Sequence, residues 1–180
     1  MFSRLLQFLN AVMMGYFIPL LLCFSIFRLF YTTAYIPSSS MTPTIQQNSI
    51  TFEKRSYSFF NNVKRGDIVT FFHPEINRYL CKRVVGLPGD TVSFCDGDVY
   101  INDTLLEEEY CLTPHSTYCN QVFHVPQDSV FCLGDNRVNS NDSRLWNNPY
   151  IPIESIESKV MFSYRVPKVL IPVYQKRLLK

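Results

Sequence analysis

A predicted β-strand and the turn that ends it occupy the run Tyr79-Leu80-Cys81-Lys82-Arg83-Val84-Val85-Gly86-Leu87-Pro88-Gly89-Asp90. The first part is rich in β-branched and aromatic side chains, and Gly-Leu-Pro-Gly-Asp then breaks regular structure. We therefore expect a strand over residues 79–85. Side chains alternate along a strand, so Lys82 shares an apolar face with Leu80 and Val84.

Similar patterns flank this run on both sides. Residues 68–72 are β-branched and aromatic and end in His73-Pro74, which predicts another strand. Residues 91–95 and 99–102 flank Asp96-Gly97-Asp98, and an Asp-Gly pair supplies the positive φ that tight hairpins need. The sequence therefore predicts a β-hairpin centred on this turn.

The fold class that follows is mainly β. Two more strands are expected over residues 130–133 and 158–165, and little of the sequence after the N-terminal segment has a helical period. The chain has 180 residues, which suits one globular domain in addition to that segment. We expect this β-rich domain to occupy residues 34–180.

The N-terminal segment is apolar. No charged side chain occurs from Leu5 to Phe27, which are bracketed by Arg4 and Arg28. At about 1.5 Å per residue, a helix here would reach about 34 Å, enough to cross a hydrocarbon core of about 30 Å. A cleaved signal peptide is the alternative, but the apolar run is longer than usual and no small-x-small cleavage site follows. We expect a membrane anchor in residues 1–33, with its helix over about 5–27.

Composition and charge exclude two classes of protein. Hydrophobic residues make up 47% of the chain and charged residues 18%, which is incompatible with an intrinsically disordered chain. The formal net charge of +2 gives no electrostatic basis for nucleic-acid binding. The charges that flank the apolar segment are balanced, so they do not determine its orientation in a membrane.

Six cysteines are present, one of them (Cys23) inside the apolar segment. The five that follow cannot all pair within one chain. Disulfides between Cys111 and Cys119 or between Cys81 and Cys95 are both open, because geometry decides which cysteines can be joined. Buried or loop thiols are the default interpretation.

The histidines give no catalytic or metal signature. Together with Cys111 and Cys119, His115 and His124 could form a metal site, but their spacing fits no common zinc pattern. A Ser-His-Asp hydrolase is disfavoured, because no G-x-S-x-G motif occurs and no histidine, His73 included, lies in a recognisable motif. No cofactor and no metal are predicted.

Three consecutive serines follow the apolar segment, in Pro37-Ser38-Ser39-Ser40-Met41-Thr42-Pro43-Thr44. The two prolines hold this segment out of a helix, and the serines place hydroxyl and N–H groups at a turn. A serine here would be exposed and held in place. Taken alone, the segment also fits an ordinary serine-rich loop.

Lys82 could serve as a base for such a serine. A lysine with a pKa of about 10.4 is neutral in only about one molecule in 10^3 at pH 7. Apolar neighbours such as Leu80 and Val84 can lower that pKa by desolvation and make the amine a usable general base. The alternative is an edge-strand lysine whose amine reaches solvent.

A polar segment follows the predicted strand at 130–133. It reads Gly134-Asp135-Asn136-Arg137-Val138-Asn139-Ser140-Asn141-Asp142-Ser143-Arg144. A buried lysine base needs an oriented acceptor, and Ser140 could provide one. A pair between Asp142 and Arg144 could clamp the loop that carries this serine.

In this order after an apolar segment, the serine segment, the run at 82–90 and the polar segment at 134–144 resemble the type I signal peptidases, which are leader peptidases with a Ser-Lys dyad. The resemblance runs in register from about residue 36 to about residue 164 and includes Asp98-Val99-Tyr100-Ile101-Asn102. Any one of these motifs alone is weak, whereas the three together are highly specific.

The resemblance implies a role for each matching residue. Ser40, immediately before Met41, would be the nucleophile, and Lys82 its general base. Ser38 would complete an oxyanion hole with the Ser40 N–H, and Ser140 would hydrogen-bond the Lys82 amine.

Asp142 and Arg144, like Met41, would support the site. Two positions depart from the family pattern: Ser39 stands where many members have glycine, and Val138 where many have aspartate.

The implied activity is removal of N-terminal signal peptides from exported preproteins, with small residues at −1 and −3. The enzyme would be a single-pass protein of the plasma membrane with its catalytic domain on the extracytoplasmic face. Its expected partners are preproteins, the lipid bilayer and the protein-export machinery, with no nucleic acid. Phe59-Phe60, Phe71-Phe72 and the basic tail from Lys168 to Lys180 are candidate lipid contacts, although core packing explains the phenylalanines equally well.

Two other classes stay open at this stage. One is a self-cleaving Ser-Lys protease, which is disfavoured because such proteins normally carry a DNA-binding domain in place of an apolar span. The other is a non-catalytic, membrane-anchored β-module that binds exported peptides.

Overall fold

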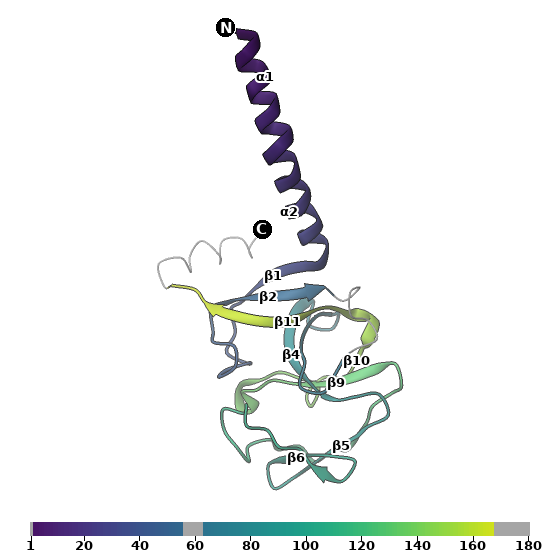
Figure 1. Cartoon of the computed structure of the whole chain (residues 1–180). Coiled ribbons are helices and arrows are strands. Elements are labelled where there is room, and N and C mark those ends of the chain that lie inside the picture. Colours follow the sequence, from purple (N-terminus) through teal and green to yellow (C-terminus); the bar gives the residue numbers. More distant parts are fainter. Residues whose placement is uncertain (1, 56–62, 168–180) are drawn as a thin grey trace.

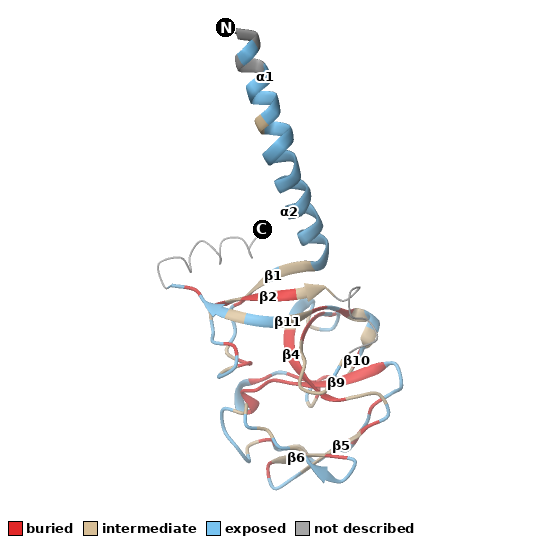
Figure 2. Cartoon of the chain, viewed as in Figure 1, coloured by how far each residue is buried: buried red, intermediate tan, exposed pale blue. Residues whose placement is uncertain are grey.

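The computed structural model describes residues 2–55 and 63–167 (Figure 1). Its N-terminal part is one helical rod with a π-helical turn in its middle, made of α1 (Phe2–Val12), η1 (Met13–Phe17) and α2 (Ile18–Phe30). Gln7–Phe30 is long and apolar enough to cross a membrane. Figure 2 shows nearly all of the described part of the rod as exposed, in contrast to β9, which is buried.

The helix ends later than the sequence predicted. It continues past Arg28 to Phe30, and the next strand begins at Tyr31, before the expected domain boundary at residue 34. A long arginine side chain can extend its charge away from an apolar environment, so one arginine near the end does not terminate a helix.

Most of the domain is a seven-stranded sheet with the order β1-β2-β11-β3-β4-β9-β10. Its strands are β1 (Tyr31–Ile36), β2 (Ser49–Arg55), β3 (Ile68–His73), β4 (Arg78–Gly86), β9 (Ser129–Leu133), β10 (Tyr150–Pro152) and β11 (Ile156–Arg165). All adjacent pairs are antiparallel. The mainly β fold is therefore confirmed, and the predicted strands at 68–72, 79–85, 130–133 and 158–165 are β3, β4, β9 and β11.

A four-stranded sheet with the order β7-β6-β5-β8 lies at the end of the molecule far from the helix (Figure 1). Its strands are β5 (Thr91–Cys95), β6 (Asp98–Ile101), β7 (Thr104–Leu105) and β8 (Phe123–His124). The predicted hairpin is the pair β5–β6, with φ of 51° at Asp96 and 83° at Gly97. The Asp-Gly pair therefore supplies the positive φ values that the turn requires.

The side chains of β4 alternate between two faces of the strand, as the sequence predicted. Leu80 and Val84 pack in the cluster that contains Phe71 and Trp146 and is made mostly of residues of the large sheet. Cys81 packs into a different cluster with Met41. Lys82 follows the same alternation on the strand.

Stacked rings join the helix to the large sheet. The ring centroids are 4.8 Å apart for Phe27 and Tyr31, 5.3 Å for Tyr31 and Phe52, and 5.0 Å for Phe52 and Phe162. We call these four residues the aromatic column. It connects α2 to β1, β2 and β11, so the end of the helix has a direct packing contact with the sheet.

Several elements were not predicted from the sequence. β1, β2 and β10 were missed because mixed polar and apolar residues weaken their patterns, and pairing with neighbouring strands stabilises them. Phe71 is buried in the core and Phe72 is exposed, so only Phe72 is available for a lipid contact. Phe59-Phe60 and the tail from Lys168 lie outside the described residues.

We expect Gly97→Ala to destabilise the protein by more than about 2 kcal/mol. Gly97 has a φ of 83°, and an added Cβ would lie 2.1 Å from the His115 carbonyl oxygen, which is backbone and cannot move aside. Gly66→Ala is the matched control, because Gly66 has a φ of 90° with open space around it. It should cost only about 1 kcal/mol. Urea unfolding of the detergent-solubilised chain, followed by Trp146 fluorescence, measures both, and equal losses would contradict the steric argument.

Candidate active site

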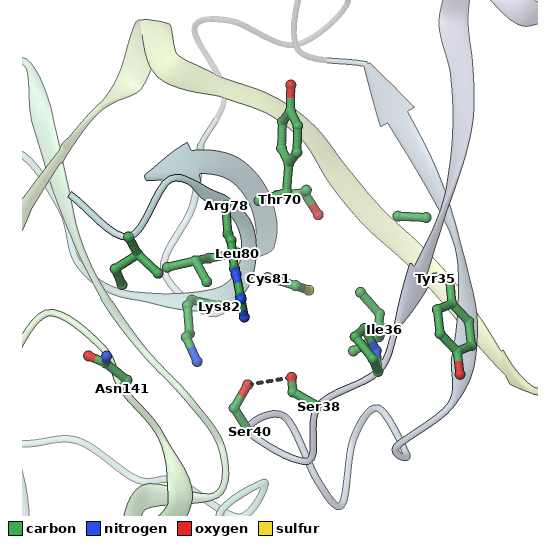
Figure 3. Close-up of a pocket in the computed structure, with 14 residues that line it drawn as sticks. Tyr35, Ile36, Ser38, Ser40, Thr70, Arg78, Leu80, Cys81, Lys82 and Asn141 are labelled. Carbon is green, nitrogen blue, oxygen red and sulfur yellow. Dashed lines mark hydrogen bonds between the residues drawn. The ribbon is translucent and has the colours of Figure 1, made fainter. Parts of the chain in front are cut away.

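A pocket of about 300 Å³ lies between β1 and the first half of β4. Its walls comprise Ala34, Tyr35, Ile36, Pro37, Ser38, Ser40, Thr70, Ile76, Arg78, Tyr79, Leu80, Cys81, Lys82 and Asn141. Figure 3 shows Ser40 on the turn after β1 and Lys82 on β4, with the lysine amine pointing toward the serine hydroxyl. The structure therefore brings Ser38, Ser40 and Lys82 to one cavity.

Hydrogen bonds from Asn136 to backbone carbonyls hold the Ser40 turn in place. Its carbonyl oxygen accepts a hydrogen bond of 3.0 Å from the Asn136 N–H, and the carbonyl before it, on Ser39, accepts one of 3.2 Å from the Asn136 amide. The Ser38 and Ser40 hydroxyl oxygens are 3.4 Å apart (Figure 3). Within the described part of the chain, no hydrogen bond uses the Ser40 N–H. That N–H is therefore available to a ligand in the pocket.

The Lys82 amine is enclosed rather than solvated. The residue is 3% exposed, and its Nζ donates a hydrogen bond of 3.0 Å to Ser140 Oγ. The hydrogen bonds of the described residues thus join the amine to Ser140, while Ser40 lies across the same cavity. The alternative of an edge-strand lysine whose amine reaches solvent is wrong, because the side chain is buried and its amine is hydrogen-bonded to Ser140.

Burial lowers the pKa of Lys82 from its ordinary value of 10.5. Desolvation is the largest cause, since a charged amine loses its hydration inside the protein. The nearby Asp142 carboxylate acts in the opposite direction and raises the pKa, and Arg144 lowers it. The net direction is downward, which increases the fraction of neutral amine near pH 7.

The loop between β9 and β10 carries Ser140 and is stabilised by interactions among its own residues. Asp142 is fully buried and pairs with Arg144 through Nε at 2.9 Å, and it accepts a hydrogen bond of 3.1 Å from the Gly134 N–H. A Cβ on Gly134 would lie 2.2 Å from Ser140 Oγ, so this position requires glycine for the loop to approach so closely. Met41 is fully buried beside the serine turn.

Asp135 is a site residue that the sequence reasoning did not single out. Its carboxylate accepts two hydrogen bonds from Arg83, at 2.8 and 2.6 Å, and one of 2.5 Å from the Thr44 hydroxyl. This pair ties the polar loop to β4 and to the turn after Ser40. Arg83 was the available signal, because it lies on a predicted strand and a buried arginine requires an acidic partner.

A second buried carboxylate, Glu53 on β2, was also missed. It is 1% exposed and accepts hydrogen bonds from the hydroxyls of Thr51 at 2.5 Å, Thr70 at 3.2 Å and Ser158. Thr70 lines the pocket, so its hydroxyl connects the pocket wall to the buried Glu53 carboxylate.

The two departures from the family pattern fit the structure. Among the described residues other than glycine, six have a positive φ, and Ser39 is not one of them. The serine turn therefore does not need glycine at that position. Val138 is 67% exposed, and a charge at that position would point to solvent.

The six cysteines are free, so neither of the disulfides left open by the sequence forms. Cys81 and Cys132 are buried, and burial raises the pKa of Cys81 to about 12. His115 binds the Asp98 carboxylate at 2.8 Å, and His124 contacts the Thr91 hydroxyl at 3.1 Å. Both histidines lie on the small sheet or the loops around it, away from the pocket.

Comparison with known sequences identifies one family. The sequence model described as "Signal peptidase, peptidase S26" matches residues 9–165. A signal peptidase I of Leptolyngbya laminosa is 42% identical over 139 residues, covering 72% of this chain and 66% of the relative. The chloroplastic thylakoidal processing peptidase 1 of Arabidopsis thaliana is 39% identical over 144 residues, covering 73% of this chain and 41% of the relative.

The alignment with the Leptolyngbya protein thus spans about two thirds of that relative. Among solved structures, a signal peptidase I from Enterococcus faecalis is 31% identical, with a TM-score of 0.47. That match covers 55% of this chain and 97% of the Enterococcus chain.

We expect Lys82→Met to stabilise the protein at pH 7, by about 1.4 kcal/mol for each unit by which the folded chain lowers the pKa. Because the pKa of Lys82 is lower in the folded than in the unfolded chain, the unfolded chain binds more protons between the two values. Wild-type stability should therefore rise with pH across that window, and the advantage of methionine should shrink toward pH 10.5. Urea unfolding of both proteins at several pH values gives the difference, and a pH-independent difference would show an amine with an ordinary pKa.

Proposed function

The chain belongs to the signal peptidase family, peptidase S26, and we propose that it cleaves signal peptides from exported preproteins with Ser40 as nucleophile and Lys82 as general base. One observation carries the assignment of these two residues. A desolvated lysine amine and a serine hydroxyl line the same pocket, and Figure 3 shows the amine directed toward the hydroxyl.

The neutral Lys82 amine starts the reaction by accepting the proton of the Ser40 hydroxyl. Desolvation supports this role, because it lowers the pKa of the amine and disfavours the charged form before substrate binds. Ser140 accepts a hydrogen bond from the amine and orients its lone pair. Ser40 Oγ then attacks the carbonyl carbon of the scissile peptide bond.

The tetrahedral intermediate carries a negative oxygen that needs hydrogen-bond donors. The unused Ser40 N–H and the Ser38 hydroxyl supply them, since the two serine side chains already lie 3.4 Å apart. When the intermediate collapses, the protonated Lys82 amine gives its proton to the leaving amino group. The same amine then deprotonates a water, which attacks the acyl-enzyme and releases the signal peptide with a free carboxylate.

Two unpaired strand edges support substrate binding as an added β-strand. β1 is at one edge of the large sheet, and β9 pairs with β4 only from Arg83 onward. In the described part of the chain, the stretch from Arg78 to Lys82 therefore has one edge without a strand partner, and it faces the pocket. An extended substrate between these edges would point alternate side chains into the pocket.

Pocket size supports the family preference for small residues at −1 and −3. Ala34, Ile36 and Leu80 are among the apolar side chains that line a volume of only about 300 Å³. Large side chains at both positions would exceed that space, whereas two small ones fit it.

The helix and the adjacent sheet support a position at a lipid bilayer. Gln7–Phe30 has spanning length, and β11, next to the aromatic column, exposes Met161 (54%), Phe162 (61%) and Tyr164 (66%). Aromatic and apolar side chains of this kind favour the membrane interface. Ser40 can lie at most roughly 35 Å along the chain from Phe30.

The cleavage site of a membrane-embedded signal peptide would lie at a similar height. We place the catalytic domain, from β1 onward, on the extracytoplasmic face of the plasma membrane, where the export machinery delivers preproteins.

Ser40→Ala and Lys82→Ala should each abolish cleavage of a purified preprotein, because the first removes the attacking oxygen and the second removes the base. Ser39→Ala is the matched control, since the Ser39 side chain has no assigned role and its backbone contacts are retained. Lys82→Arg should also be inactive, because arginine stays protonated. Incubation of each detergent-solubilised protein with one signal-bearing substrate measures this. Full activity of the Ser40→Ala protein would show that Ser40 is not the nucleophile. A wild type that binds the preprotein without cleaving it would indicate a peptide-binding module, and cleavage of the chain alone would indicate a self-cleaving protease.

The rate should rise with pH as Lys82 loses its proton. Because burial lowers the pKa of the amine, the midpoint of kcat/KM against pH should lie below 10.5. Initial rates between about pH 6 and pH 10 on one preprotein give the profile. A rate that is constant across this range would contradict the assignment of Lys82 as base.

A further inference from the structure

A segment between two strands of the four-stranded sheet contacts the loop that carries Ser140. We call residues 108–117 the strap; it belongs to the connection between β7 and β8. Its main contact is Glu108, whose two carboxylate oxygens accept hydrogen bonds from Arg137 at 2.6 and 2.7 Å. At the far end of the strap, the Thr117 hydroxyl accepts a bond of 2.7 Å from the same guanidinium.

Arg137, a residue of the loop itself, is also hydrogen-bonded to other residues of the loop. Its Nε donates 2.9 Å to the Gly134 carbonyl, and its own carbonyl accepts a bond of 2.8 Å from Arg144, the partner of Asp142. The Arg137 side chain is fully buried and the Glu108 side chain is 10% exposed. A buried arginine that loses its carboxylate is left as an unpaired charge, so this pair has a strong effect on the position of the loop.

The strap also contacts the other ion pair of the site. The Tyr110 ring lies 3.8 Å from the Arg83 guanidinium carbon, and the Tyr110 hydroxyl donates 2.6 Å to Glu108. The Leu112 N–H donates 3.2 Å to the carbonyl of Asp135, which pairs with Arg83. Glu108 is therefore hydrogen-bonded to Arg137 directly and connected to the Arg83 pair through Tyr110.

The loop has little room to move without displacing Ser140. A Cβ on Gly134 would lie 2.2 Å from Ser140 Oγ and 2.6 Å from the Ser40 carbonyl oxygen, which shows how closely these backbones approach. Ser140 in turn accepts the hydrogen bond of Lys82 at 3.0 Å. A shift of the loop would lengthen that bond and admit water to the amine.

We propose that Glu108 is a positioning residue for the cleavage reaction: by holding Arg137 it fixes the loop at the distance at which Ser140 orients the Lys82 amine and water is excluded. The inference rests on the proposed function. Glu108 does not line the catalytic pocket, so its effect reaches the reaction only through the loop. The groups that face the Lys82 amine are Asp142 and Arg144 of the loop, Cys81 of β4 and Cys132 of β9.

The test is Glu108→Gln in the full chain, with Glu107→Gln and Glu109→Gln as matched controls. The three glutamates are consecutive and lose the same charge, but Glu107 and Glu109 are exposed. We expect kcat to fall about tenfold or more for Glu108→Gln, with KM changed less than about twofold, because the lost contact acts on the base rather than on substrate binding. Both controls should retain wild-type kinetics.

The pH profile separates positioning from a general structural role. Admission of water to the Lys82 amine removes part of the desolvation that lowers its pKa, so the Glu108→Gln profile should move to higher pH and the deficit should shrink in alkali. Glu108→Asp keeps the carboxylate and should recover part of kcat. An unchanged kcat and profile would overturn the proposal, as would a loss of kcat that is the same at every pH.

A folding defect is tested separately. If Glu108→Gln does not retain the far-UV circular dichroism of the wild type, Tyr110→Phe replaces it, because this variant removes only the hydroxyl that donates to Glu108. A smaller alkaline shift in Tyr110→Phe supports the proposal, and a wild-type profile contradicts it. If the wild type and both controls fail to cleave any preprotein, the proposed function fails and not the role of Glu108.

Discussion

The Lys82 amine is held inside the protein with the Ser140 hydroxyl as its hydrogen-bond partner, and the chemistry of the site depends on this placement. Lys82 is 3% exposed, so its charged amine loses most of its hydration. The fraction of neutral amine at a given pH is therefore larger than for a lysine on the surface. The cost of removing the amine from water is met by the packing around β4. That strand pairs with β3 at Lys82 and with β9 from Arg83 onward, which fixes the position of the lysine backbone.

Three buried ion pairs hold the loop that supplies Ser140. Asp135 pairs with Arg83 of β4, Arg137 with Glu108 of the strap, and Asp142 with Arg144 of the loop itself. Buried pairs of this kind add little net stability compared with apolar packing, but loss of one partner leaves a charge without compensation. Their value here is geometric, because they join the loop to two other parts of the fold and close it upon itself.

The aromatic column links the large sheet, which carries this site, to the apolar N-terminal helix. Phe27 of α2 stacks on Tyr31 of β1, and the same stack continues across Phe52 and Phe162. β1 leads from the end of α2 to the serine turn, and β2 lies between β1 and β11 in the sheet (Figure 1). The pocket is lined in part by β1, so it lies on the strand that directly follows the helix. In the proposed function, this arrangement would restrict the height of Ser40 above the bilayer, as cleavage of membrane-embedded segments requires.

Local chemistry was enough to predict the apolar span, the Asp96-Gly97 hairpin and four strands of the large sheet, because apolar length, turn residues and β-branched runs act over a few neighbouring positions. The residues around Ser40, Lys82 and Ser140 could be proposed as a site because their three motifs together resemble those of the type I signal peptidases. Asp135, Glu53 and Glu108 could not, since the partner of each lies far away in the sequence. Strand order and loop packing determine which buried charges become partners. Because the protein interior has a low dielectric constant, these long-range pairings interact strongly.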